Sequence, residues 1–358
     1  MLEPALTLST RNRSQTYARN CSTTHQTDHP RFEVVGILSK LRSLEFMGPT
    51  MRLSVIICTW NRAKNLRETL RSLEQSQLPA DTTWEIIIVD NNSSDETRAV
   101  CQFFVDRSPE RYRYIFEKRQ GKSFALNTAV ETAKGQILMF TDDDVTVDPA
   151  WLSETLRVFE RHPCAGVTGK IIAQWNSDKP DWVTSAGPYK LMPAILSYDL
   201  GEEACEIKAP AYGANLSLRR EVFEKYGLFR TDLGPTAGSE IRGEDNEFCW
   251  RLLHSGERII YAPKAIVFHP VEKHRIDKRY FQTWYYGMGQ SLPRLDPAPE
   301  GAVRYFGVPR YMFRWYLRDL MLWITSLTPK RRFYYKLQFW ATRGQMMEEK
   351  RLWQNRDT

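Results

Sequence analysis

Three consecutive aspartates, Asp142, Asp143 and Asp144, offer a dense group of metal-binding oxygens. They directly follow the apolar run of residues 137–140, which is typical of a buried strand. Alternate side chains of an extended segment point to the same side, so Asp142 and Asp144 can face one hard divalent cation, Mn²⁺ or Mg²⁺. Such a cation can also hold a diphosphate. The alternative interpretation is a solvated acidic turn, with Asp148 capping the following helix.

Polar side chains also end two other strand-like runs, residues 53–58 and 85–89. A carboxylate fixed at a strand end, such as Asp90, can accept hydrogen bonds from a base or a ribose. The alternative for Asp90 is an Asx turn that satisfies only neighbouring backbone groups. The candidate residues at these two strand ends are Thr59, Asn61, Asp90 and Asn92.

Lys122 lies in the sequence Gly121-Lys122-Ser123, at the start of a predicted helix. A phosphate loop of the Walker type needs a glycine five residues before Gly121, but that position is Phe116. The sequence therefore argues against a nucleoside triphosphatase. At the start of a helix Lys122 can still meet a phosphate or a carboxylate, or it can be solvated.

Two carboxylates and a histidine follow further along the chain. Glu244 and Asp245 open a predicted helix, where negative charge complements the helix dipole. Asp245 can instead act as a general base that takes a proton from an acceptor hydroxyl. His269 follows a strand-like run and is either a structural histidine or a further metal ligand.

Alternating strands and helices must position these groups. Near-continuous apolar strands between the helices predict an α/β fold, with a mostly parallel central sheet covered by helices on both faces. In such sheets ligands bind outside the carboxyl ends of the strands, where the polar residues lie. Helices are expected over residues 63–75, over 94–106 with Ser94 as N-cap, over 122–134 with Gly135 as C-cap, and from Pro149 onward.

Six motifs, in this order, make the chain resemble the family 2 glycosyltransferases, which have the GT-A fold. The resemblance covers residues 53 to about 270. The motifs are Val55-Ile-Ile-Cys-Thr-Trp-Asn-Arg62, Ile87-Ile-Val-Asp-Asn-Asn-Ser-Ser-Asp95, Gly121-Lys-Ser-Phe-Ala-Leu-Asn127, Phe140-Thr-Asp-Asp-Asp144, Gly213-Ala-Asn-Leu-Ser-Leu-Arg219 and Gly243-Glu-Asp-Asn246.

The resemblance implies a role for each candidate residue. Asp142 and Asp144 match the ends of the family's D-x-D metal motif, and His269 matches a histidine that completes the metal site in some members. Asp245 matches the catalytic base, with Glu244 beside it. The nucleotide-sugar site implied in this way contains Thr59, Asn61, Asp90, Asn92, Lys122, Asp142, Asp143, Gly213 and Asn215.

The reaction that the resemblance implies is inverting, metal-dependent transfer of a sugar from a nucleotide-diphosphate sugar to an acceptor hydroxyl. A UDP-sugar donor is favoured by family habit, and the expected setting is cell-surface glycan or polysaccharide synthesis. No clear Q-x-x-R-W pattern, which marks processive members, follows Asp245, so transfer of a single sugar is expected.

Two other functions stay open. A nucleotidyltransferase would need a glycine-rich loop after the first strand, but residues 59–62, which follow that strand here, contain no glycine. A non-catalytic module that binds nucleotide sugars or glycans on the same fold would be marked by loss of the acidic residues, which are all present.

The last quarter of the chain differs in composition from the body. Residues 272–358 contain 17 Lys and Arg against 8 Asp and Glu, and 18 of the 44 aromatic residues. Helices are expected over residues 280–290 and 303–327, parted by prolines that include Pro293. The uncharged stretch 320–327 is too short to span a bilayer, which needs about 20 residues. This tail is predicted to lie on an anionic membrane surface or to pack on the catalytic domain, and it carries no recognised nucleic-acid motif.

The sequence thus divides into a disordered extension at residues 1–50, a catalytic domain at 51–271 and a basic helical tail at 272–358. Residues 1–50 are alternatively a transit peptide, because they are rich in Arg and Ser and poor in acids. The six scattered cysteines include no C-x-x-C pair, which argues against a zinc site and a disulfide framework. We expect the protein to lie in the cytoplasm and to be attached peripherally to the cytoplasmic face of the membrane.

Overall fold

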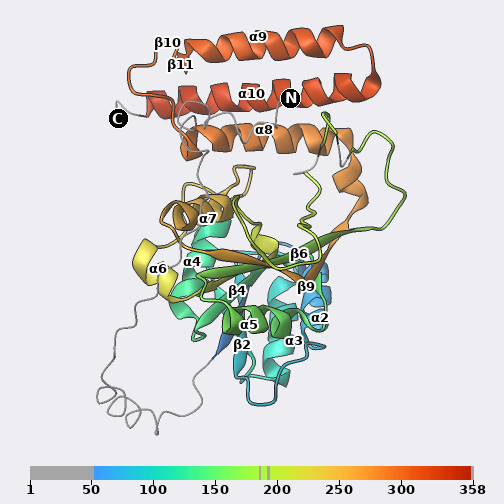
Figure 1. Ribbon diagram of the computed structural model, residues 1–358, viewed down its shortest axis with the longest axis vertical. Helices are drawn as coiled ribbons and strands as arrows, with labels where there is room; N and C mark the ends of the chain where they lie inside the picture. The colour runs from blue at the N-terminus through green and yellow to red at the C-terminus, as the bar shows by residue number, and fades with distance from the viewer. Residues whose placement is uncertain (1–51, 185–186, 192–193, 356–358) are drawn as a thin grey trace, which may run out of the picture. The chain divides into compact units, whose positions relative to one another are not determined.

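The computed structural model describes residues 52–184, 187–191 and 194–355, so the predicted extension at residues 1–50 lies outside the described residues. The central sheet has the strand order β3-β2-β1-β4-β8-β6-β9-β5, with β7 also paired to β9 (Figure 1). Strands β1 to β4 are parallel to one another, as are β6 and β9, while β8 runs antiparallel between β4 and β6. The mostly parallel sheet predicted from the apolar runs is confirmed.

The elements of the sheet region follow one another in the expected alternation. Its strands are β1 (Leu53–Thr59), β2 (Trp84–Asp90), β3 (Tyr112–Phe116), β4 (Ile137–Thr141), β5 (Thr146–Val147), β6 (Gly166–Trp175), β7 (Cys205–Glu206), β8 (Leu216–Arg219) and β9 (Ile259–Val271). Its helices are α2 (Ala63–Leu73), α3 (Thr97–Arg107), α4 (Lys122–Thr132), α5 (Trp151–Arg161), α6 (Glu221–Tyr226) and α7 (Glu244–His254), with short 3₁₀ turns η4 (Gly213–Asn215) and η5 (Lys273–Ile276).

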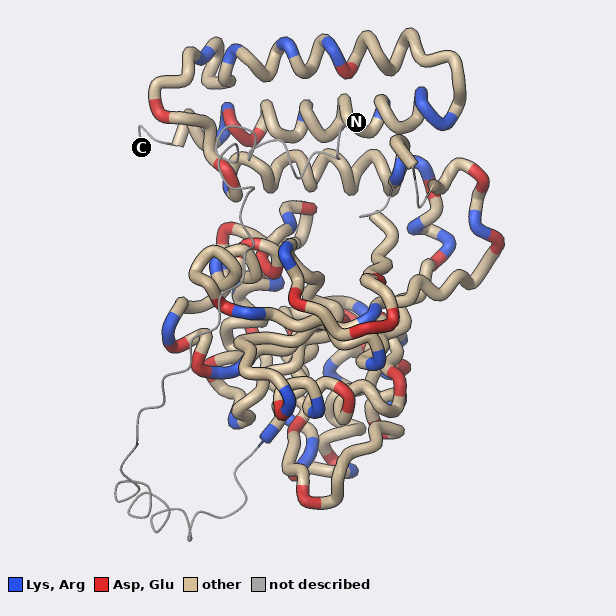
Figure 2. The backbone as a smooth tube through the Cα atoms, in the orientation of Figure 1, with Lys and Arg blue, Asp and Glu red and all other residues tan. Residues whose placement is uncertain are grey.

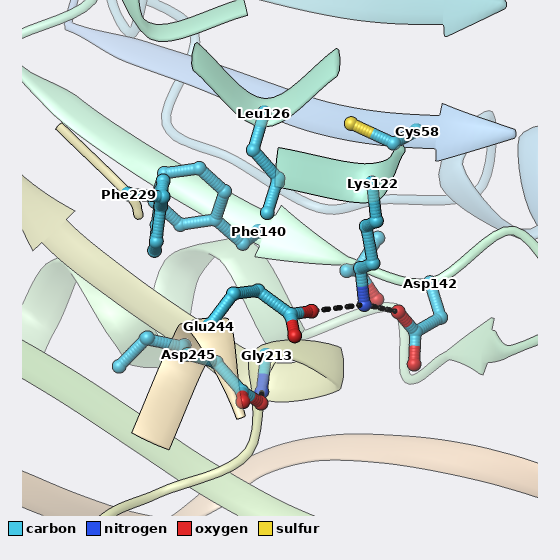
Figure 3. Close-up of a pocket in the computed structure, with 11 residues that line it drawn as sticks. Cys58, Lys122, Leu126, Phe140, Asp142, Gly213, Phe229, Glu244 and Asp245 are labelled. Atoms are coloured by element: carbon cyan, nitrogen blue, oxygen red, sulfur yellow. Dashed lines mark hydrogen bonds and ion pairs between the residues drawn. The ribbon is translucent and has the colours of Figure 1, made fainter. Parts of the chain in front are cut away.

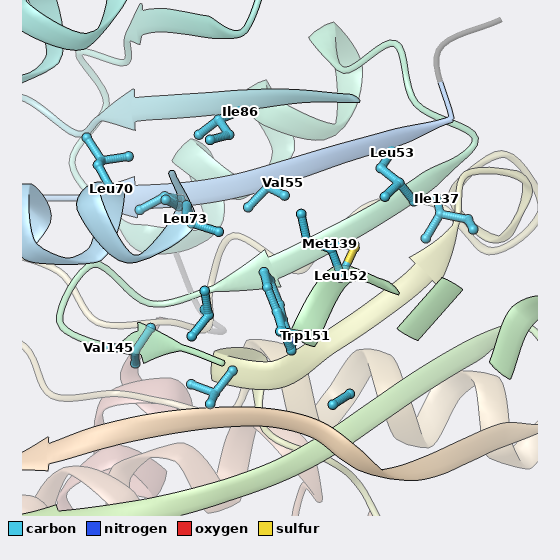
Figure 4. Close-up of a cluster of buried hydrophobic side chains, with 14 of the residues drawn as sticks. Leu53, Val55, Leu70, Leu73, Ile86, Ile137, Met139, Val145, Trp151 and Leu152 are labelled. Atoms are coloured by element: carbon cyan, nitrogen blue, oxygen red, sulfur yellow. The ribbon is translucent and has the colours of Figure 1, made fainter. Parts of the chain in front are cut away.

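Both faces of the sheet are covered because its central strands carry buried apolar side chains on both sides. Val55 and Ile57 of β1 pack in the cluster that includes residues of α2, α3 and α5 (Figure 4). Ile56, between them, packs on the other face with residues of α4, α6 and α7. Because successive side chains of a strand point to opposite faces of the sheet, β1 contributes to two separate hydrophobic cores.

Several predicted helix ends are wrong, and α2, for example, ends at Leu73 rather than at residue 75. Helix α3 begins at Thr97 rather than at Ser94, because the side chain of Asp95 accepts the hydrogen bond from the Thr97 backbone N–H. Helix α4 ends at Thr132, with Ala133 as its cap. Gly135 is needed for a different reason: a Cβ there would lie 2.4 Å from the backbone nitrogen of Ser54. The helix expected from Pro149 begins at Trp151.

The C-terminal region contains three long helices instead of the two that were expected. They are α8 (Lys278–Leu295), α9 (Arg310–Thr325) and α10 (Pro329–Gln354), with a small hairpin of β10 (Arg304–Tyr305) and β11 (Val308–Pro309) before α9. Pro293 lies inside α8 and does not end it. Across the described residues, no helix combines the length and the apolar character needed to cross a membrane.

Helices α8 and α10 approach so closely that glycine is required where they cross. A Cβ on Gly289 would lie 2.0 Å from the carbonyl oxygen of Ala341, and one on Gly344 would lie 2.1 Å from that of Tyr286. Helix α8 also supports the segment before α7, since the Arg242 backbone N–H donates to Ser291 Oγ at 2.8 Å. The C-terminal helices are therefore packed tightly and are joined to the sheet region by this hydrogen bond.

We expect Gly289→Ala to lower the free energy of unfolding by about 2 kcal/mol, because overpacking a close backbone contact forces the helices apart. The sign of this stability change is informative, because helix propensity alone would make the alanine variant more stable by up to about 1 kcal/mol. Urea unfolding followed by tryptophan fluorescence measures the change, with Thr283→Ala at an exposed position of α8 as the control. A Gly289→Ala protein at least as stable as the wild type would contradict the close packing.

Candidate active site

The carboxyl ends of β1, β2 and β4 meet at one edge of the sheet. In the parallel register Thr59 of β1 lies opposite Asp90 of β2, and Ile57 of β1 lies opposite Thr141 of β4. The aspartate triplet leaves β4 at this edge. Strand β9 runs in the same direction and brings His269 there as well, because β5 pairs Thr146 with Phe268.

Asp142, Asp144 and His269 form a three-residue group with one ligand atom from each within 4.8 Å of the others. Asp144 and His269 are both buried, and the His269 ring nitrogen Nε2 lies 3.5 Å from Asp144 Oδ1. That carboxylate oxygen is buried and has no hydrogen-bond partner. A buried carboxylate oxygen without a partner is costly. Two carboxylates and an imidazole suit Mn²⁺ or a similar ion, so this donor set fits a divalent cation.

Two arginines partly neutralise the triplet. Arg62 Nη1 donates to Asp144 Oδ2 at 2.7 Å and to Asp143 Oδ1 at 3.2 Å. Arg275, on η5, places Nη2 2.5 Å from Asp144 Oδ2 and Nη1 3.5 Å from His269 Nε2. Burial raises the pKa of Asp143 to about 6, since the pull of Arg62 does not outweigh burial together with the charge of Asp144. The guanidinium of Arg275 therefore contacts two of the three residues that would hold a cation.

Lys122 lies between two carboxylates in a pocket at the same edge (Figure 3). Its Nζ atom is 3.0 Å from Asp142 Oδ1 and 3.5 Å from Glu244 Oε1. Burial alone would raise the pKa of Asp142, but Lys122 and further positive charge lower it to about 2. Burial would lower the pKa of Lys122, yet Asp142 and Glu244 hold it well above its usual value. Of the alternatives open for Lys122, the structure shows contact with carboxylates rather than full solvation.

Asp245 lies on the same pocket as Asp142, next to Gly213 (Figure 3). Its Oδ2 accepts a 2.7 Å hydrogen bond from the Gly213 backbone N–H, and its Oδ1 accepts one of 2.8 Å from Asn246 N–H. The chain enters α7 through Gly243 at a φ of 99°, a left-handed conformation that favours glycine. Burial, reinforced by the neighbouring charge of Glu244, raises the pKa of Asp245 to about 6. A carboxylate with a pKa near neutrality is suited to accept a proton.

The remaining residues predicted for the nucleotide site do not line the pocket that contains Lys122 and Asp245. Asp90 accepts hydrogen bonds from the Tyr114 hydroxyl at 3.0 Å and from Ser93 N–H at 2.9 Å, and it does not line the pocket with Lys122. Thr59 is buried, and its Oγ1 has no hydrogen-bond partner. Asn61 and Asn92 lie in the two loops beyond them, both with positive φ.

The side-chain amide of Asn215 makes hydrogen bonds within the fold. Its Oδ1 accepts from Trp151 Nε1 at 2.8 Å, and its Nδ2 donates to the carbonyls of Lys170 and Ala265. The amide is therefore used to join η4 to β6 and β9, and it is not free to contact a ligand. Its neighbour in the motif, Gly213, lines the pocket.

Arg275 and Arg62 are site residues that the sequence did not single out. Arg62 ends the first motif, and its position after a strand end was the available signal. Nothing in the sequence around Arg275 marks it, because its place depends on η5 folding back against β9 after residue 271. The described cysteines are free, and Cys205 among them is exposed.

Known structures with the same architecture define the class as GT-A. The mannosyltransferase PcManGT from Pyrobaculum calidifontis, solved with GDP-Man and Mn²⁺, aligns with a TM-score of 0.50 at 20% identity, over 87% of this chain and 79% of its own. S. aureus TarS 1–349 in complex with UDP-GlcNAc aligns with a TM-score of 0.50 at 15% identity, over 85% of this chain and 92% of its own. At these identities the likeness establishes the fold.

The family follows from the sequence comparisons. Residues 54–227 match the profile of glycosyl transferase family 2. The succinoglycan biosynthesis protein ExoM of Rhizobium meliloti is 27% identical over 69% of this chain and 75% of its own length. The glucosyl-dolichyl phosphate glucuronosyltransferase of Haloferax volcanii is 26% identical over 68% and 78%. The chain therefore carries a family 2 glycosyltransferase domain and is a glycosyltransferase, as its motifs predicted.

Proposed function

We propose that this glycosyltransferase catalyses inverting, divalent-metal-dependent transfer of one sugar from a nucleotide-diphosphate sugar to an acceptor hydroxyl. The observation that carries the proposal is the shared pocket of Asp142 and Asp245. Asp142, a candidate metal ligand, and Asp245, a carboxylate with a raised pKa, line the same small pocket. A displacement in which one residue activates the acceptor and a cation stabilises the leaving diphosphate needs both groups in the same pocket.

In this mechanism Asp245 accepts the proton of the acceptor hydroxyl, whose oxygen attacks the anomeric carbon from the face opposite the diphosphate. The Gly213 and Asn246 backbone N–H groups hold the Asp245 carboxylate in place. Lys122 supplies positive charge beside Asp142, where the diphosphate would lie. Asp142, Asp144 and His269 would hold the cation, which offsets the charge of the leaving diphosphate.

For the donor we propose a nucleoside-diphosphate sugar held at the ends of β1 and β2. The buried and unsatisfied hydroxyl of Thr59 and the carboxylate of Asp90 support this assignment, because both offer polar atoms at the sheet edge where such ligands bind. Solved structures of the same fold contain GDP-Man and UDP-GlcNAc. UDP remains the favoured nucleotide only by family habit.

For the acceptor we propose a lipid-linked glycan or polysaccharide precursor on the cytoplasmic face of a membrane. Two relatives support this class, since one is named for succinoglycan biosynthesis and the other for a glucosyl-dolichyl phosphate acceptor. The basic and aromatic C-terminal region supports a location at an anionic surface.

The reaction is tested by incubating the protein with Mn²⁺ and a panel of nucleotide sugars and identifying the released product. We expect slow release of a nucleoside diphosphate from at least one donor. Release of pyrophosphate from a nucleoside triphosphate in a parallel incubation with a sugar 1-phosphate would instead indicate a nucleotidyltransferase. Binding of a donor without any release, by a folded protein, would indicate a non-catalytic module.

The pH dependence of kcat/KM reports the base. Asp245 acts only when ionised, and its pKa is raised to about 6, so we expect kcat/KM to rise through about pH 6 and to level off above it. Glu244→Gln removes the negative charge that raises this pKa, so the inflection should move to lower pH. The measurement is a pH profile at saturating Mn²⁺. An inflection that stays in place or moves upward in Glu244→Gln would argue against Asp245 as the base.

Arg275→Ala should bind Mn²⁺ about tenfold more tightly in the absence of nucleotide, because the guanidinium competes with the cation for Asp144 and His269. Electron paramagnetic resonance of free Mn²⁺ measures this affinity directly. Arg279→Ala, a neighbouring exposed arginine, is the matched control and should bind as the wild type does. Unchanged or weaker binding in Arg275→Ala would show that the arginine does not compete for the site.

A further inference from the structure

One side of α9 presents large apolar side chains to the exterior of the described chain. Leu317, Met321 and Ile324 are 57%, 65% and 64% exposed, and Leu327, just beyond the helix end, is 97% exposed. Spacings of four, three and three residues place these four side chains along one side of the helix. We call them the α9 ridge.

The part of the chain that the structure describes leaves the α9 ridge uncovered. Helix α9 packs on α10 through ring contacts of Tyr316 and Trp323 with Phe339. Helix α10 in turn packs on α8, and Figure 1 shows α10 between α8 and α9, so α9 is the outermost of the three helices. Asp319, the acid of this helix, is buried and is held by Arg318 and by Thr342 of α10. Within the described residues, the ridge is therefore a surface on which no other element packs.

Lys and Arg residues flank the α9 ridge in sequence, along α9 and at the start of α10 (Figure 2). Between residues 310 and 346 the chain has eight Lys and Arg, and Asp319 is its one acid. Because Asp319 is only 3% exposed, no acidic side chain reaches the surface along α9. The exposed cations nearest the ridge in sequence are Arg310, Arg314, Arg318, Lys330 and Arg332.

We propose that the α9 ridge inserts its apolar side chains into the interfacial region of a lipid bilayer, while the flanking arginines and lysines bind anionic headgroups. An apolar stripe flanked by cations and free of exposed acid matches the layered chemistry of an anionic bilayer surface. A partner protein or nucleic acid of negative charge would match the cations but would leave Met321, Ile324 and Leu327 without an apolar environment. The helix lies along the surface rather than across it, since Arg314 and Arg318 interrupt its apolar sequence.

This inference rests on the proposed function for its purpose, which is to bring the pocket to a membrane-borne acceptor. Its test measures lipid binding alone and can fail separately from catalysis. The full chain is sedimented with vesicles of phosphatidylcholine, and with vesicles in which about a third of the lipid is phosphatidylglycerol. We expect binding to the anionic vesicles that weakens as salt is raised, and little binding to the neutral ones.

Two sets of variants locate the contact. Met321→Ser/Ile324→Ser/Leu327→Ser, and separately Arg310→Gln/Arg314→Gln, should each lower the partition onto anionic vesicles by at least about tenfold. The matched controls are Phe103→Ser, which removes an exposed apolar side chain of α3, and Arg67→Gln/Arg98→Gln, which removes two exposed cations of α2 and α3. The controls should bind vesicles as the wild type does. Circular dichroism and nucleotide release verify that every variant is folded.

Three results would overturn the proposal. The first is absence of binding to anionic vesicles by the folded wild type, and the second is equal loss in the ridge variants and their controls. The third is a dimer in light scattering that becomes a monomer in the triple serine variant while vesicle binding is unchanged. That result would assign the ridge to a second copy of the chain.

Discussion

Asp245→Asn is expected to lower the rate of sugar transfer by about 10²- to 10⁴-fold, the range contributed by a positioned general base. Asparagine keeps the shape of the side chain and can still accept the hydrogen bond from Gly213 N–H through its carbonyl oxygen. It cannot take a proton from the acceptor. Donor affinity should therefore stay close to that of the wild type, and the loss should appear in kcat.

The control for this variant is Glu247→Gln, which removes a charge from the same first turn of α7. Glu247 pairs with Arg251 on the same helix and does not line the pocket. The Glu247→Gln variant should transfer sugar at close to the wild-type rate. A fall in donor binding that matches the fall in rate for Asp245→Asn would indicate a structural role, and a variant of nearly full activity would remove Asp245 from the mechanism.

Asp142→Asn/Asp144→Asn is expected to abolish measurable Mn²⁺ binding and to lower turnover by about 10³-fold. The two substitutions remove both carboxylates from the three-residue group, and a cation that offsets diphosphate charge contributes a factor of this order. A Mn²⁺ titration followed by electron paramagnetic resonance measures the first effect. Nucleotide release measures the second.

The central residue of the triplet supplies the control. Asp143 is outside the three-residue group and pairs with Arg62. Asp143→Asn should keep most of the Mn²⁺ affinity, although it has the same chemistry and an adjacent position. Equal loss of Mn²⁺ binding in Asp143→Asn and the double variant would show that total negative charge, rather than a defined ligand set, holds the ion.

The parts of the fold that sequence predicts well are those decided by local patterns. Runs of apolar residues such as 53–58 define buried strands, and parallel strands bring their carboxyl ends to one edge. Asp90 and the triplet are thus predicted at the same edge of the sheet. The helix ends were less accurate, because a side chain such as Asp95 can cap a helix two residues before its start.

The C-terminal helices were harder to predict because packing decides them. Proline disfavours a helix interior by about 3 kcal/mol, yet Pro293 is buried within α8, where tertiary contacts outweigh the local preference. Helix α10 contains Gly344, a poor helix former that close contact with α8 requires. Neither effect can be read from periodicity.

Within the site, the contacts that sequence could not supply join distant segments. Arg275 meets Asp144 across 131 residues, and Asp245 accepts a hydrogen bond from Gly213 across 32. Asn215 shows the opposite limitation. It belongs to a motif that the resemblance assigns to the sugar site, but its amide is fully used within the fold.

The most direct test of the account is a crystal structure of the protein with Mn²⁺ and a nucleoside diphosphate, with anomalous scattering recorded near the manganese edge. We predict one anomalous peak about 2.2 Å from oxygen or nitrogen atoms of Asp142, Asp144 and His269, and bonded to a diphosphate oxygen. Arg275 should have moved off Asp144. Bound nucleotide with its diphosphate away from this edge, or a manganese peak on other residues, would contradict the account.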